Sequence, residues 1–95
     1  MLHILIKSPF DTDINLLLSM IRISDDLLFL QDSVISVIKN NIFLEKFLKC
    51  PAKLYVLKND VYARGIKNKI SKKIKLINYY EFVKLTIKHS KSISW

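Results

Sequence analysis

Hydrophobic and polar positions change their spacing abruptly between residues 25 and 45. The run Leu27–Leu30 is continuously apolar, which is typical of a parallel strand that is buried on both faces. Asp32 and Ser33 follow this run as candidate helix caps, and from Val34 onward apolar residues recur with helical spacing. The pattern predicts a buried parallel strand that leads into a helix through a tight polar turn.

The same alternation of strand and helix patterns extends along the whole chain. Further strands are predicted at Leu2–Ile6, Lys53–Leu57 and Ile74–Ile77, and the tail Ile93–Trp95 is a candidate fifth strand at the sheet edge. Helical patterns cover residues 14–22, 42–49, 59–64 and 79–89. This alternation predicts an α/β fold of one domain over residues 1–95, with a small parallel sheet of four or five strands and helices on both faces.

Local signals mark the ends of several elements. Asn78 and Glu81 have the spacing of a capping box, and Gly65, the only glycine, suits the left-handed position after a helix. Asn40 is expected to break the helical pattern with a left-handed turn. Segment 67–73 is expected to be a polar connector. The residues expected on the inner face of the last helix are Tyr79, Phe82, Val83 and Thr86.

Composition restricts the classes of function. No apolar run approaches the roughly 20 residues that span a bilayer, and the first ten residues lack the apolar length of a signal peptide, so we expect a cytoplasmic protein without membrane attachment. A single cysteine excludes an internal disulfide and agrees with a reducing compartment. A single glycine excludes a glycine-rich phosphate loop, and one cysteine with two distant histidines does not resemble a zinc site. Neither a cofactor nor a metal is expected.

Charge is distributed unevenly along the chain. The net charge is +8, but residues 1–48 carry four cations and six anions, whereas residues 49–95 carry twelve cations and two anions. Such asymmetry is compatible with a nucleic-acid surface. No aromatic residue stands between the lysines of the densest run. This pattern is more typical of a solvated connector than of a surface that binds nucleic-acid bases. They are Lys67, Lys69, Lys72, Lys73 and Lys75.

Few side chains have the chemistry of a catalytic group. Cys50 is the only thiol, but it ends a predicted helix, where the carbonyl dipoles oppose a thiolate. It is a weak candidate for a catalytic residue, and a small residue filling a helix end is the favoured interpretation. His3 lies within a strand and is expected to be buried and hydrogen-bonded, and Asp32 is interpreted as a helix cap rather than as a functional carboxylate.

An ordered set of motifs over essentially the whole chain resembles the TusB/DsrH family of sulfur-relay proteins. The motifs are Met1-Leu2-His3, Lys7-Ser8-Pro9-Phe10, Asp26-Leu27-Leu28-Phe29-Leu30-Gln31-Asp32, Leu54-Tyr55-Val56-Leu57, Asp60, Ala63-Arg64-Gly65, Tyr79, Glu81-Phe82-Val83-Lys84-Leu85-Thr86 and Trp95. No single motif is diagnostic. The order and spacing of the set carry the resemblance, which implies a DsrE/DsrF/DsrH-like fold.

The resemblance also implies a function. It implies a non-catalytic subunit of the TusBCD complex, a dimer of heterotrimers with TusC-like and TusD-like subunits, which receives persulfide sulfur from TusA and passes it to TusE for 2-thiolation of the tRNA wobble uridine. The sulfur-bearing cysteine is then expected on the TusD-like partner. DsrH members carry a cysteine in the first helix, and the corresponding residue here is Met20, whose thioether cannot form a persulfide.

Two other functions remain open from the residues. One is a DsrH-like or Cys50-based sulfur carrier, and the other is a basic module that contacts tRNA directly, which the lack of interleaved aromatics disfavours. Working residues of parallel sheets lie at the carboxyl ends of the strands. We therefore expect a partner to bind the loops after the first two strands, at Ser8, Phe10, Gln31 and Asp32.

Overall fold

Five parallel strands form one sheet in the computed structural model, which describes all 95 residues. The strands are β1 (Leu2–Leu5), β2 (Asp26–Phe29), β3 (Lys53–Leu57), β4 (Lys75–Ile77) and β5 (Ser92–Ser94). Their spatial order is β4-β3-β2-β1-β5, and every pair is parallel. The predicted α/β class and parallel sheet are therefore confirmed, and the tail provides the fifth strand.

Helices connect the strands. The α-helices are α1 (Ile14–Met20), α2 (Ile42–Leu48), α3 (Lys58–Ala63) and α4 (Tyr79–Lys88). The 3-10 helices are η1 (Pro9–Asp11), η2 (Gln31–Val37) and η3 (Lys67–Lys69). None of these helices is long and apolar enough to span a bilayer.

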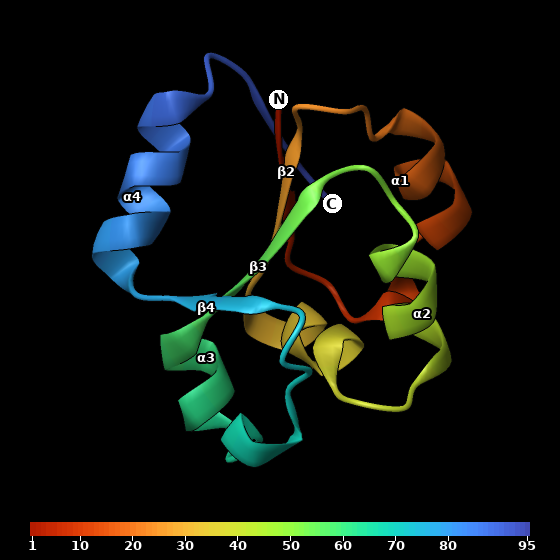
Figure 1. The fold of residues 1–95 in the computed structure, drawn as a ribbon, viewed down its shortest axis with the longest axis vertical. Helices are drawn as coiled ribbons and strands as arrows, with labels where there is room; N and C mark the ends of the chain where they lie inside the picture. Colours follow the sequence, from red (N-terminus) through yellow and green to blue (C-terminus); the bar gives the residue numbers. More distant parts are fainter.

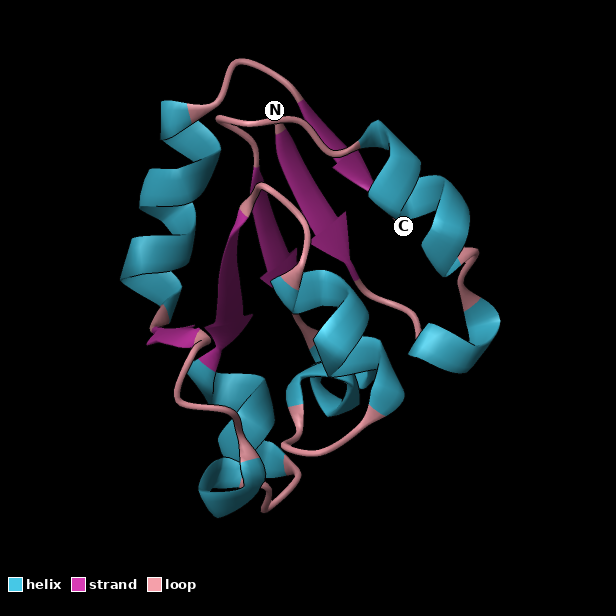
Figure 2. Ribbon diagram, turned by 45° about the vertical axis from the view of Figure 1, so that its right-hand side comes forward, coloured by secondary structure: helices cyan, strands magenta, loops and turns pink.

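The sheet divides the apolar core into two unequal layers. One face packs against α1, η2 and α2, and a cluster of 14 buried residues lies there, including Phe29 and Phe47 with ring centroids 4.9 Å apart. The other face is covered by α4 alone, and its cluster contains six buried residues, among them Leu28 and Leu85. Figures 1 and 2 show α4 standing alone on its side of the sheet.

Several helix signals read from the sequence are confirmed. Asn78 and Glu81 form a reciprocal capping box at the start of α4, with N···O distances of 2.9 and 3.1 Å. Gly65 has a φ of +65° directly after α3, and Asn40 has a φ of +64°. These positions need the left-handed backbone region, which glycine and asparagine tolerate best.

The helix expected after β2 is a 3-10 helix rather than an α-helix. Its buried residues are Ser33, Val34, Ser36 and Val37, a repeat of three that matches the three residues per turn of a 3-10 helix. The segment starts from a left-handed residue, Gln31, with a φ of +53°. Helix α1 is also shorter than expected, because Ile21 is extended and the N–H of Arg22 donates to Asp25 rather than to a helical carbonyl.

The expected inner face of the last helix is wrong at three of its four positions, and only Phe82 packs toward the core. Tyr79 and Val83 are 60% and 41% exposed, and Thr86 is exposed too, whereas Leu85 is buried and Phe82 half-buried. The connector 67–73 also differs from the expectation. Ile70 within it is buried and bridges Ile38 in antiparallel fashion, so this segment belongs to the core as well as to the surface.

Ser33 joins the carboxyl ends of β1 and β2. Its buried hydroxyl accepts the N–H of Leu30 at 3.0 Å and lies 2.5 Å from the carbonyl oxygen of Leu5 and 2.8 Å from that of Leu30, to either of which it can donate. Ser36, one 3-10 turn later, is equally buried, but its hydroxyl has no partner.

This contrast predicts different effects for two similar substitutions. Ser33→Ala should lower the free energy of unfolding by about 1–2 kcal/mol, because buried backbone groups lose a partner. Ser36→Ala should change it by less than about 0.5 kcal/mol or raise it, because the hydroxyl it removes is desolvated without compensation. Urea unfolding of both variants measures the difference, and equal losses would contradict this account of Ser33.

Candidate functional site

The carboxyl edge of the sheet brings the loops after β1, β2 and β3 together. The backbone N–H of Gln31 donates to a carboxylate oxygen of Asp60 in α3 at 2.6 Å. Asp32, the next residue, pairs with Arg64 at the end of the same helix, with an Nη2–Oδ1 distance of 2.5 Å. Two contacts between residues about 30 positions apart therefore fix the loop after β2 against α3.

Asp32 does not have the role expected of it. Asp32 was expected to cap a helix, but its carboxylate is 71% exposed and faces Arg64, and Ser33 provides the hydroxyl at that turn. Asp60 lies in the first turn of α3, as the helical pattern from residue 59 predicts, and its carboxylate accepts the Gln31 N–H. Each carboxylate therefore bonds a residue of another element rather than a residue of its own helix.

Ser8 and Phe10 occupy the loop after β1, as expected, but with unlike exposure. The Ser8 hydroxyl accepts the N–H of Phe10 at 3.2 Å and its carbonyl accepts the Thr12 hydroxyl at 3.0 Å, so Ser8 shapes the turn. Phe10 is 78% exposed, and its ring meets Phe43 of α2 edge-on with centroids 5.1 Å apart. The Phe10 ring therefore faces solvent on one side and packs against Phe43 on the other.

Cys50 lies away from this edge, just after α2 and three residues before β3 begins. It is half-buried beside a shallow groove of about 420 Å³ that Leu18 and Lys49 also line. Burial raises the pKa of the Cys50 thiol, and hydrogen bonds from the local backbone offset this only in part. The thiol is therefore neutral at pH 7, and a neutral thiol is a poor nucleophile.

The opposite, amino edge holds a hydrogen-bonded group that begins with Asp25. Trp95 Nε1–H donates to His3 Nδ1 at 3.3 Å, so the other nitrogen of the fully buried His3 ring carries the hydrogen that bonds Asp25 at 3.0 Å. Burial opposes ionisation of Asp25, but bonds from the Arg22 N–H, the Met1 amino group and His3 outweigh it and lower its pKa from 3.8 to about 2. The expectation of a buried, bonded His3 is confirmed.

Asp26 forms a second such group. Its Oδ2 accepts from His89 Nε2 at 2.7 Å and from Lys88 Nζ at 2.9 Å. Burial opposes its ionisation, but His89 and Lys88 outweigh burial and lower the pKa of Asp26. Sequence reasoning did not single out Asp25 or Asp26. Two adjacent acids at the start of a buried apolar strand could have indicated this arrangement. A buried carboxylate needs hydrogen-bond partners, so such a pair predicts donors nearby.

Donors of the chain itself bind both carboxylate oxygens of Asp25 and the Oδ2 of Asp26. These bonds fasten the end of α4 and the C-terminal segment to the sheet. No three His, Cys, Asp or Glu side chains lie together so that they could hold a metal ion.

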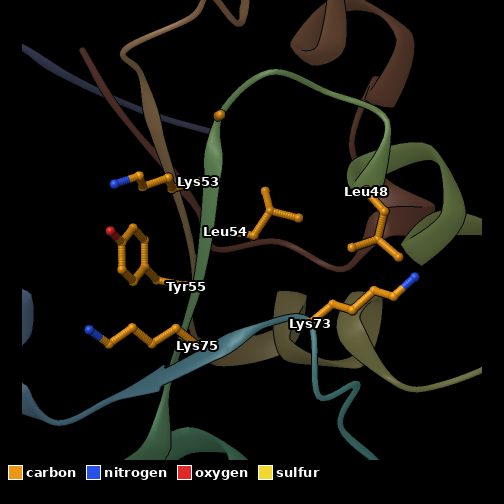
Figure 3. A pocket seen from close by; sticks show the side chains of 7 residues that line it. Leu48, Lys53, Leu54, Tyr55, Lys73 and Lys75 are labelled. Atoms are coloured by element: carbon orange, nitrogen blue, oxygen red, sulfur yellow. The ribbon is translucent and has the colours of Figure 1, made fainter.

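A groove of about 350 Å³ lies where β4 meets β3. Figure 3 shows Lys53, Tyr55 and Lys75 projecting to one side of β3, and Leu54 with Leu48 to the other. Burial and the charge of Asp26 raise the pKa of Tyr55, so its phenol stays protonated at neutral pH. The groove offers cationic and apolar contacts but neither a thiol nor a carboxylate.

Comparisons with known proteins agree on one family. A family model described as "DsrH like protein" matches residues 7–92. The chain is 54% identical to protein TusB of Buchnera aphidicola subsp. Acyrthosiphon pisum (strain 5A) and 43% identical to protein TusB of Escherichia coli (strain K12), each over 95 residues and 100% of both chains.

Solved structures share the fold. The crystal structure of the YchN protein of E. coli has a TM-score of 0.78 at 13% identity and covers 99% of this chain and 97% of its own. The solution structure of protein Tm0979 of Thermotoga maritima has a TM-score of 0.68 at 29% identity, with 96% and 97% covered. The predicted DsrE/DsrF/DsrH-like architecture agrees with the family match and these neighbours.

The hydrogen bonds to Asp25 predict a pH dependence of stability. Because the folded pKa of Asp25 is below its ordinary value of 3.8, its stabilising contribution is complete above about pH 4–5 and is lost as the pH falls through about 2. We expect a contribution of about 1–2 kcal/mol, since solvent around the Met1 amino group screens part of the interaction.

Asp25→Asn should therefore lower the free energy of unfolding at pH 7, and the deficit should shrink as the pH approaches 2. Asp13→Asn is the matched control, because asparagine can replace the exposed Asp13 as the cap of α1. Chemical unfolding from pH 2 to 7 measures both, and a deficit that stays constant over this range would refute the assignment.

Proposed function

Because the chain belongs to the DsrH family, we propose that it is a non-catalytic subunit of a sulfur-relay complex that modifies tRNA. In this proposal its partners are TusC-like and TusD-like subunits in a cytoplasmic dimer of heterotrimers, and the whole chain, residues 1–95, acts as one domain. The complex takes persulfide sulfur from TusA and passes it to TusE for 2-thiolation of the wobble uridine.

The state of Cys50 is the observation that carries the proposal. Sulfur transfer requires a thiolate that attacks the outer sulfur of a donor persulfide. The single thiol of this chain is half-buried, lies at the carbonyl end of α2 and has a raised pKa. Met20, on the exposed end of α1, offers only a thioether. The reactive cysteine is accordingly proposed to belong to a partner.

The carboxyl edge supports a role in assembly. Phe10 exposes a large aromatic surface in the loop after β1, and the Asp32–Arg64 pair in the loop after β2 is accessible. The edge therefore offers an aromatic anchor and charged groups, which protein interfaces combine. We propose that this edge contacts a partner subunit through Phe10, Gln31 and Asp32, while Ser8 shapes the loop that presents them.

Sulfur loading of the reconstituted complex tests the first part of the proposal. We expect the chain to co-purify with its TusC and TusD counterparts, and we expect Cys50→Ser to leave the amount of sulfur transferred to TusE unchanged. Mass spectrometry of the loaded complex should place the persulfide on a partner cysteine. A stoichiometric persulfide on Cys50 would instead establish this chain as a carrier.

A pair of equally exposed residues tests the interface. Phe10→Ser should weaken assembly at least about tenfold, because a central aromatic anchor contributes about 2 kcal/mol or more. Ile23→Ser is the control, since Ile23 is also 78% exposed but lies at the amino edge, three residues before β2 begins. Native mass spectrometry over a dilution series measures both, and equal effects would exclude this edge as the contact.

A further inference from the structure

The structure gathers lysines from three separate segments beside η3. Lys39 follows η2, Lys58 begins α3, and Lys67 and Lys69 lie in η3 itself. The N–H of Lys39 donates to the carbonyl of Lys69 at 2.8 Å, which holds the first of these segments against the third. Nothing in the sequence spacing places Lys39 or Lys58 next to the lysines of residues 67–75.

A groove runs between the segment of Lys39 and the segment that contains η3. It has a volume of about 420 Å³, and Lys39, Lys67, Asn68 and Lys72 are among the residues that line it. The antiparallel bridge between Ile38 and Ile70 fixes its two sides. Tyr62 and Lys58 do not line the groove but lie beside it, because Lys67 both lines the groove and reaches over the Tyr62 ring. We call the groove together with this adjoining patch, formed by Lys39, Lys58, Lys67, Lys72 and Tyr62, the basic groove.

Tyr62 supplies the aromatic ring that the lysine run lacks in sequence. It projects from α3, is 44% exposed, and has the ammonium groups of Lys58 and Lys67 over its ring at 5.2 and 5.1 Å from the centroid. Lys67, as a hydrogen-bond partner, is the largest cause that lowers the pKa of the Tyr62 phenol. An aromatic platform with cations beside it is the arrangement that single-stranded nucleic acids bind.

No acidic side chain forms an ion pair with a lysine of the basic groove. The acidic partners of all ion pairs in the structure are Asp25, Asp26 and Asp32, and none of them pairs with a lysine of the groove. Between Asp60 and Glu81 the chain contains six cations and no anion. The field at this surface is therefore positive and available to an anionic ligand.

We propose that the basic groove binds the phosphodiester backbone of an RNA and that Tyr62 stacks on an unpaired base. The lysines would exchange their weak contacts with the tyrosine ring for phosphate oxygens. An acidic peptide could satisfy the lysines but has no planar base to stack on Tyr62, so the ring favours a nucleic acid. The choice of RNA over DNA rests on the proposed function.

Salt dependence of binding tests the lysines. The probe is a fluorescently labelled single-stranded RNA of about 20 nucleotides, and anisotropy gives its affinity for the full-length chain between about 50 and 200 mM salt. Replacing Lys39, Lys58, Lys67 and Lys72 with glutamine should reduce the slope of log K against log salt by about 2–3, since each phosphate contact on a single strand contributes about 0.7.

The control removes the same charge elsewhere. Glutamine at Lys46, Lys49, Lys84 and Lys91, which are exposed on α2, on α4 and near the C-terminal strand, should change the slope by less than about 1. Thermal unfolding confirms that both sets of variants are folded. Equal losses from the two sets would overturn the proposal, because binding would then depend on net charge alone.

Two tyrosines separate stacking from charge. Tyr62→Leu should weaken RNA binding about tenfold. Tyr80→Leu should weaken it less than about twofold, although Lys84 lies over the Tyr80 ring at 4.7 Å, because Tyr80 is outside the groove. Equal effects would refute the stacking role of Tyr62.

Other ligands distinguish the remaining alternatives. A single-stranded DNA of the same sequence that binds as tightly as the RNA would refute the choice of RNA while retaining the groove. An acidic peptide that binds more tightly than both would overturn the nucleic-acid proposal. Neither result affects co-purification with the TusC and TusD counterparts, so failure here is distinguishable from failure of the proposed function.

Discussion

Burial of β2 on both faces couples the two layers of this small protein. Leu27 and Phe29 point into the larger cluster and Leu28 into the smaller one, and none of the three is accessible to solvent. Because this strand also pairs with β1 and β3, its position fixes the register of three strands at once. Its two ends therefore become the places where the chain concentrates polar contacts, with Asp25 and Asp26 at one edge and the Ser33 turn at the other.

The core pattern of the strands could be predicted because it is local. A continuous apolar run identified β2, and the Asn78–Glu81 spacing identified the start of α4. The rotation of α4 could not be predicted, because it depends on long-range contacts: Lys88 and His89 reach Asp26, more than 60 residues earlier, and turn Leu85 instead of Val83 toward the sheet. The 3-10 geometry after β2 depends in the same way on the bonds that Ser33 makes to Leu5.

The candidate interface was predictable only as a location. Parallel strands bring their carboxyl ends to one edge, so the loops containing Phe10 and Gln31 had to be neighbours. The partners of Asp32 and Gln31, which are Arg64 and Asp60, lie about 30 residues away and carry no short-range signal. The contact between Tyr62 and Lys67 also carries no signal in the sequence, because no aromatic residue lies within the lysine run itself.

The pairing of β5 with β1 has a consequence for synthesis. Strand β1 precedes its β5 partner by nearly the whole described chain, yet one of its sides exchanges hydrogen bonds only with residues 91–95, and His3 meets the Trp95 indole 92 positions later. During translation that side of β1 stays unpaired until the last of these residues leaves the ribosome. A nascent chain that stops before residue 91 would present an open strand edge, which is a template for aggregation.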